Sequence, residues 1–266
     1  MKITNTQRLK FKKLIVFDLD GTLAPTKAVM DREMAKLMEQ LLSVKKVAVI
    51  GGGKYELFKL QLLGPLKVSK PLFHRLYLFP TTSTAFYKYN QGWQNVYTHQ
   101  LTKAERSNII HTFQKVLKDI NYKHPKKTYG KIIEDRGTQV TFSALGQDVV
   151  KALGKTGVKM KEDWLKQNKP LKMKIAGLVA KLLPNLEIHA AGFTSIDVTK
   201  KGIDKAYGLY QIEKQLGVKI KDMVFIGDAI FPGGNDYAVT KTKVDYVPVK
   251  GPQETKKIIR YIIGQK

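Results

Sequence analysis

Residues 13–23 read KLIVFDLDGTL, and this stretch decides the fold. Residues 13–17 contain four consecutive apolar residues from Leu14 to Phe17, which predicts a short buried strand over 13–17. Asp18 and Asp20 follow directly at its carboxyl end, with Gly21 behind them. A buried strand that ends in two closely spaced carboxylates and a glycine is typical of a ligand-binding edge in a parallel sheet.

The neighbouring segments extend this strand into a layered α/β unit. Residues 31–43 carry apolar side chains at helical spacing, and residues 47–50 form a second apolar run that enters Gly51-Gly52-Gly53. Strand, helix and strand within about 35 residues predict a βαβ unit and a parallel sheet. Residues 223–227 and 243–249 predict two further strands, and residues 253–263 a closing helix.

The middle of the chain has a different pattern, which predicts an inserted α+β domain over residues 82–198. Aromatic and polar residues alternate over 84–101 around a turn at 90–92, which indicates a hairpin. Thr102 and Glu105 form a capping box at the start of a helix. Residues 139–142 and 186–198 predict extended segments, and residues 171–183 a helix that Pro184 ends. The core is accordingly expected at residues 1–81 and 199–266.

The acidic residues gather where buried strands end. Asp228 and Asp236 follow the strand at 223–227, as Asp18 and Asp20 follow the first one. Converging carboxylates repel one another unless a cation compensates them, and hard oxygen ligands suit Mg²⁺. A single aspartate of this kind is more often a turn or cap residue, but two such clusters at strand ends predict a metal site.

Composition limits the function classes. The 266 residues are 43% apolar and 26% charged, which indicates a globular protein, and the absence of Cys excludes disulfides and thiol catalysis. No apolar run approaches the roughly 20 residues that span a membrane, and we expect a cytoplasmic protein. The net charge of +25 attracts phosphorylated metabolites and polyanions. Only six of the 47 basic residues are Arg, and the lysines are scattered, which disfavours specific nucleic-acid binding.

The motifs together resemble those of the haloacid dehalogenase (HAD) superfamily of phosphotransferases. VFDLDGTL at residues 16–23 is similar to the first motif, IGGG at 50–53 falls at the second, GIDK at 202–205 resembles the third, and residues 227–236 resemble the fourth. At the second motif most members carry Ser or Thr where this chain has Gly51. The order and spacing extend over nearly the whole chain.

A narrower resemblance points to the eukaryotic-type phosphomannomutases. It rests on the paired glycines at the second motif, on DRGT at residues 135–138, on SIDV at 195–198 and on FPGGND at 231–236. PTK at residues 25–27 is also similar to a Pro-Ala-Arg stretch of that branch. The resemblance implies a Rossmann-like core with an inserted type IIB cap, and it leaves a homodimer through the cap open.

The resemblance also implies roles for individual residues. Asp18 would be the nucleophile, Asp20 the general acid and base, and Lys205 the cation that balances phosphate and Asp18. The Asp18 carboxylate, the Asp20 carbonyl and Asp228 would hold Mg²⁺, with Asp236 as an outer partner of the site. The substrate and its phosphate would contact a further set of residues: Thr22, Lys27, Gly51, Gly52, Arg136, Ser195 and Asp197.

Two outcomes share this chemistry. A phosphatase lets water attack the aspartyl phosphate, whereas a mutase returns the phosphate to another hydroxyl of a phosphorylated sugar. Gln147 stands where the phosphomannomutase pattern has Arg, and a stretch around the Phe-Arg-Asn-Gly of that pattern is missing. The sequence therefore ranks hydrolysis first and phosphomannomutase transfer second. A non-catalytic nucleic-acid-binding protein is the remote alternative. The retained catalytic set argues against it: Asp18, Asp20, Lys205 and Asp228.

Overall fold

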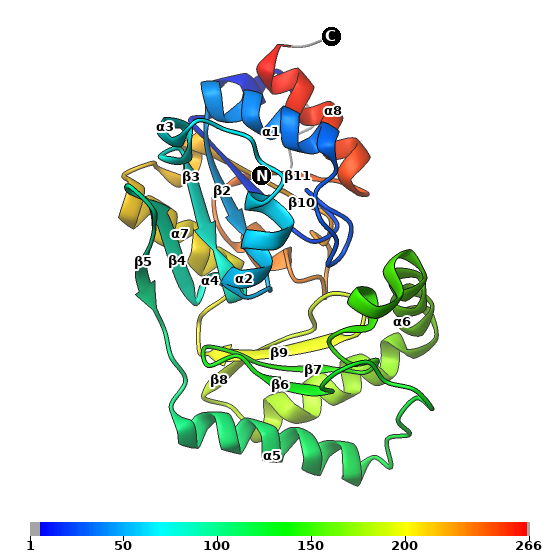
Figure 1. The fold of residues 1–266 in the computed structure, drawn as a ribbon. Helices are drawn as coiled ribbons and strands as arrows, with labels where there is room; N and C mark the ends of the chain where they lie inside the picture. The colour runs from blue at the N-terminus through cyan, green and yellow to red at the C-terminus, as the bar shows by residue number, and fades with distance from the viewer. Residues whose placement is uncertain (1–5, 265–266) are drawn as a thin grey trace. The chain divides into compact units, whose positions relative to one another are not determined.

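The computed structural model describes residues 6–264, which form two compact units (Figure 1). Unit 1 contains the residues up to Thr98 and from Asp204 onward, and unit 2 contains His99–Ile203. The mixed α/β class predicted from the sequence is confirmed. Within residues 6–264, no helix has both the length and the apolar character needed to cross a membrane.

Unit 1 is built on a seven-stranded sheet. Its strands are, in spatial order, β11 (Asp245–Pro248), β10 (Met223–Gly227), β1 (Leu14–Asp18), β2 (Lys46–Ile50), β3 (Leu76–Phe79), β4 (Ala85–Tyr89) and β5 (Trp93–Thr98). The first five are parallel, and β4 and β5 add an antiparallel hairpin at one edge. Strand β1 is the middle one of the five parallel strands and is fully buried, and its carboxyl end lies between those of β10 and β2.

Helices cover both faces of this sheet. Alternate residues of β1 enter different cores: Ile15 and Phe17 pack with α1 (Arg32–Val44) and α8 (Pro252–Ile263), whereas Leu14 and Val16 pack with α7 (Lys205–Leu216) (Figure 1). The shorter helical segments are η1 (Thr6–Phe11), α2 (Tyr55–Phe58), the π-helix η2 (Lys59–Leu63), α3 (Lys70–Phe73), α4 (Pro80–Ser83), η3 (Ile220–Asp222) and η4 (Tyr237–Lys241).

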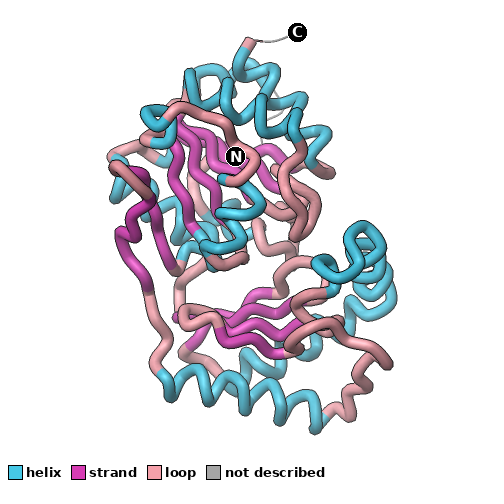
Figure 2. The backbone as a smooth tube through the Cα atoms, in the orientation of Figure 1, coloured by secondary structure: helices cyan, strands magenta, loops and turns pink. Residues whose placement is uncertain are grey.

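Unit 2 is an antiparallel sheet backed by two helices (Figure 2). Its strands are β6 (Ile133–Asp135), β7 (Val140–Ser143), β9 (Ser195–Lys200) and β8 (Leu186–His189), in that spatial order, and its helices are α5 (Lys103–Asp119) and α6 (Val149–Leu182). The apolar side chains of β7 and β9 pack with both helices. The predicted capping box at Thr102 and Glu105 is present at the start of α5.

Two features of the chain differ from the sequence-based expectation. The aromatic hairpin pairs with β3 in the sheet of unit 1, where Phe86 stacks on Phe79 with ring centroids 4.5 Å apart, so unit 2 begins at His99 rather than at residue 82. Helix α6 begins at Val149, well before the predicted start at residue 171, with Pro170 inside it and a break in its helical backbone at Gly154.

Candidate active site

The structure brings the aspartates of two motifs together at one edge of the sheet in unit 1. Strands β1 and β10 pair in parallel register from Leu14 opposite Met223 to Phe17 opposite Ile226. In this register Asp18 falls opposite Gly227, so Asp18 and Asp228 lie at the carboxyl ends of adjacent strands. Asp18 is 2% exposed, and Asp236, on the loop after β10, is completely buried.

Lys205 is the buried cation of this site. It is the first residue of α7, whose N-terminus is capped by Asp204 through a 2.8 Å bond from the Tyr207 N–H. The Lys205 ammonium donates to both Asp18 and Asp236, and all three side chains are almost fully buried. Asp236 also accepts a 3.0 Å bond from the Ala229 N–H.

Burial and charge set the protonation behaviour of these groups. Burial raises the pKa of the Asp18 carboxyl well above its ordinary value, Asp236 and Asp228 add to the effect, and Lys205 opposes it. For Asp228, burial and then the charge of Asp236 raise the pKa to about 6. Burial alone would lower the pKa of Lys205, but the adjacent charges of Asp18 and Asp236 outweigh it and raise that pKa.

The carboxylates fit a divalent cation. Asp18, Asp228 and Asp236 each offer an oxygen, and these three oxygens lie within 4.8 Å of one another. When all three are ionised, they carry three negative charges against the one positive charge of Lys205, so a divalent ion would neutralise the cluster. Carboxylate oxygens are also the ligand type that Mg²⁺ prefers.

Two glycines make room for this convergence of carboxylates. At Gly21, where φ is +88°, a Cβ would clash with the Asp228 carboxylate. At Gly227 a Cβ would clash with the carboxylate of Asp236. The glycines next to the motif aspartates are therefore required by side-chain packing, and at Gly21 also by the backbone conformation.

The Asp20 carboxyl is held by hydrogen bonds of its own. One oxygen, Oδ1, accepts a 2.6 Å bond from the backbone N–H of Lys27 and a 3.2 Å bond from the Gln61 amide. Lys27 adopts a left-handed backbone conformation, with φ at +55°. Sequence reasoning selected Lys27 as a substrate contact and missed Gln61, whose one signal is a polar residue within a leucine-rich run.

The remaining predicted residues of unit 1 are Thr22, Gly51 and Gly52. The Thr22 hydroxyl is buried and lies 3.4 Å from an Asp228 oxygen, as a weak hydrogen bond. The N–H of Gly51 donates to the carbonyl of Phe79 at 3.2 Å, so this donor is used next to the sheet. That Gly51 and Gly52 contact a phosphate stays a prediction.

Two of the predicted residues of unit 2, Arg136 and Asp197, form hydrogen bonds with neighbouring side chains. Asp197 on β9 accepts a 2.7 Å bond from the hydroxyl of Thr141 on β7. Arg136 donates to Glu134 at 2.8 Å and to the side-chain oxygen of Gln147 at 3.0 Å. Ser195 lies two residues before Asp197 and therefore on the same face of β9.

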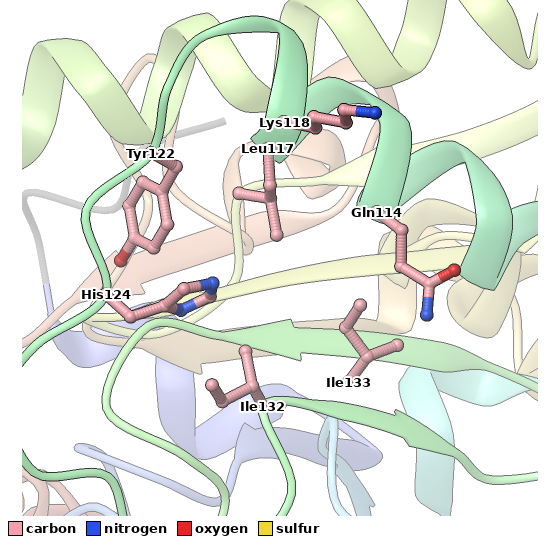
Figure 3. Close-up of a pocket in the computed structure, with 7 residues that line it drawn as sticks. All are labelled: Gln114, Leu117, Lys118, Tyr122, His124, Ile132 and Ile133. Carbon is pink, nitrogen blue, oxygen red and sulfur yellow. The ribbon is translucent and has the colours of Figure 1, made fainter.

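Unit 2 also contains a pocket of about 390 Å³ between the end of α5 and strand β6 (Figure 3). Its lining is mainly apolar, with Leu117, Ile132 and Ile133 contributing. The hydroxyl of Tyr122 is buried and has no hydrogen-bond partner within residues 6–264. None of the residues that line this pocket is one of the predicted site residues.

Comparison with known proteins identifies the family. The family model described as "Eukaryotic phosphomannomutase" matches residues 34–265. The chain belongs to this family. Similar relatives are the phosphomannomutase of Encephalitozoon cuniculi, 27% identical with 92% of this chain and 91% of the relative covered, and human phosphomannomutase 1, 28% identical with 87% and 84% covered.

Solved structures place the family member in the HAD fold. An IMP-bound IMP-nucleotidase of Plasmodium falciparum aligns with a TM-score of 0.70, at 18% identity, over 95% of this chain and 68% of that one. A trehalose-6-phosphate phosphatase of Aspergillus fumigatus aligns with a TM-score of 0.55, at 15% identity, over the full length of both. The predicted superfamily is confirmed, and this phosphomannomutase-family chain is an enzyme of the HAD phosphotransferase and phosphatase class.

Proposed function

We propose that this protein is a Mg²⁺-dependent phosphotransferase of sugar phosphates that works in the manner of a phosphomannomutase. The observation that carries the proposal is the buried contact of Lys205 with Asp18 and Asp236 beside Asp228. The family match over residues 34–265 supports mutase transfer above hydrolysis, which reverses the ranking suggested by the sequence alone.

The first chemical step would use Asp18 as the nucleophile. Its carboxylate oxygen would form a bond to the phosphorus of a phosphate ester while the bond from phosphorus to the sugar oxygen breaks. Asp20 would donate a proton to that departing oxygen. Lys205 would hold Asp18 in place and oppose the negative charge that collects around the phosphoryl group.

The second step would reverse the first with a different hydroxyl. A sugar hydroxyl would attack the phosphorus of the aspartyl phosphate, Asp20 would accept its proton, and the Asp18 carboxylate would be released. A Mg²⁺ ion held by Asp18 and Asp228, with Asp236 close by, would supply positive charge to the phosphoryl oxygens. The net charge of +25 would attract the anionic substrate to the protein.

Hydrolysis is the second candidate, and one observation favours it. Gln147 accepts a hydrogen bond from Arg136, at a position where the phosphomannomutase pattern has a second cation. A neutral amide binds phosphate more weakly than a guanidinium does. Weaker retention of a bisphosphate would favour attack by water on the aspartyl phosphate.

A paired assay separates these outcomes. Isomerisation of mannose phosphate, with Mg²⁺ and a sugar bisphosphate activator, is measured beside release of inorganic phosphate from a panel of hexose phosphates. We expect isomerisation to exceed hydrolysis. Phosphate release without isomerisation would identify a phosphatase, and inactivity in both assays would contradict the phosphotransfer proposal.

A further inference from the structure

Gln61 is a fully enclosed amide that connects Asp20 to the loop that follows the first motif. Its side chain is 1% exposed. The amide nitrogen donates to Asp20 Oδ1 at 3.2 Å and to the carbonyl of Ala28 at 3.0 Å, and these two bonds use both of its N–H groups. The backbone carbonyl of Gln61 accepts a third bond, at 3.0 Å, from the Met30 N–H.

A short π-helix presents this side chain. The N–H of Gly64 donates to the carbonyl of Lys59, five residues back, and this wider turn is typical of functional sites. Gln61 and Leu62 are buried, whereas Leu60 is 61% exposed. A leucine at position 61 would satisfy packing without the desolvation of an amide, so packing alone does not account for glutamine here.

The hydrogen bonds distinguish the two oxygens of the Asp20 carboxyl. Oδ1 accepts from the Lys27 N–H at 2.6 Å and from Gln61. An oxygen that faces two N–H donors can only accept, so the proton that Asp20 gives and takes is carried on Oδ2. Two donors on one oxygen also restrict rotation of the carboxyl group.

We infer that Gln61 is a positioning residue that fixes the Asp20 carboxyl so that its Oδ2 exchanges protons with the substrate oxygen. The inference rests on the proposed role of Asp20 as general acid and base. Gln61 itself forms no bond to the reacting atoms. With the amide removed, the Lys27 N–H would be the one remaining donor of this pair, and the carboxyl would sample other orientations.

The competing explanation is that Gln61 only anchors the loop through Ala28 and Met30. The Met30 bond uses backbone atoms and survives any substitution at position 61. A purely structural role would reduce all activities together. A positioning role would reduce the reaction most where the leaving oxygen needs a proton.

The test compares Gln61→Met and Gln61→Glu with the wild type on two substrates. Release of the leaving group in the first turnover is measured for p-nitrophenyl phosphate and for a hexose phosphate. The nitrophenolate needs little protonation as it leaves, whereas the sugar alkoxide must be protonated. We expect both variants to lose about 10- to 100-fold on the hexose phosphate and less than about threefold on p-nitrophenyl phosphate. Leu60→Ala, on the exposed side of the same turn, is the matched control and should retain both rates.

Equal losses on the two substrates, or no loss, would overturn the positioning role. Asp20→Asn, measured in parallel, separates this failure from failure of the proposed function. If Asp20→Asn loses more rate on the hexose phosphate than on p-nitrophenyl phosphate and the Gln61 variants do not, only the role of Gln61 is wrong. If Asp20→Asn does not discriminate either, the acid and base assignment falls and the inference falls with it.

Discussion

Asp228→Asn should stabilise the metal-free protein while it impairs metal binding. The substitution keeps the size of the side chain and an oxygen opposite the Thr22 hydroxyl, but it removes one negative charge from the cluster. Burial and the charge of Asp236 raise the pKa of Asp228 from its ordinary 3.8 to about 6. The ionised carboxylate therefore disfavours the folded state by about 3 kcal/mol at pH 7.5.

The sign of the pH dependence follows from proton binding. The folded state binds the proton of Asp228 more tightly than the unfolded state does, so this group reduces stability as the pH rises from about 4 to about 6. Asp228→Asn should accordingly increase the free energy of unfolding by about 2–3 kcal/mol at pH 7.5 and by only about 1 kcal/mol at pH 4.5.

Urea unfolding in EDTA at these two pH values measures the effect. Added Mg²⁺ should then stabilise the wild type more than the variant, because the ion binds the intact carboxylates of the folded state. Asp222→Asn is the matched control, since a hydrogen bond from Lys13 lowers the pKa of Asp222. Removing the charge of Asp222 should therefore not increase the free energy of unfolding. A variant no more stable than the wild type at pH 7.5 in EDTA would refute this electrostatic account.

Four further substitutions test the proposed chemistry and the electrostatics of buried groups. Asp18→Asn should abolish formation of the phosphoenzyme, which is measured as transfer of labelled phosphate from the substrate to the protein. Circular dichroism should show that the variant keeps its fold. Lys205→Met should lower kcat/KM by an amount equivalent to about 2–4 kcal/mol, because it removes the buried cation. Burial lowers the pKa of Lys172 to about 8, so the folded state binds this proton less tightly than the unfolded state does. As the pH rises from 7 to 10, the unfolding free energy of the wild type should therefore increase by about 2 kcal/mol relative to that of Lys172→Met, measured by urea unfolding. Gln147→Arg should place a second guanidinium beside Arg136 and tighten calorimetrically measured binding of a sugar bisphosphate more than of a monophosphate.

The parts of unit 1 that the sequence predicts well depend on local patterns. The run at residues 14–17 is apolar without interruption, because β1 is buried on both faces. Asp31 begins α1 by accepting a 2.8 Å bond from the Met34 N–H, which is an ordinary N-terminal cap. Asp18 and Asp228 are recognised for a related reason, since the carboxyl ends of parallel strands meet at one edge.

The parts that the sequence does not predict depend on contacts with distant segments. The alternating pattern of residues 85–98 identifies a hairpin but not the sheet it joins, which is decided by pairing with β3 and by the stacking of Tyr87 on Tyr55 at 4.0 Å. The helix predicted at residues 171–183 is only the last part of α6, which begins at Val149 and continues through Pro170. Gln61 reaches Asp20 across 41 residues, and no periodicity encodes that bond.

The cost of the acidic cluster is itself an argument for function. Asp18 and Asp236 share the one ammonium of Lys205, and Asp228 lies beside them. A buried charged group of this kind is often replaced by apolar residues without loss of stability. The neighbouring glycines, Gly21 and Gly227, leave room for the carboxylates where a side chain would collide with them. A sequence selected for stability alone would keep neither the uncompensated charge nor the glycines. Their joint presence, on a sheet edge suited to ligands, is what a divalent cation and a phosphoryl group would require.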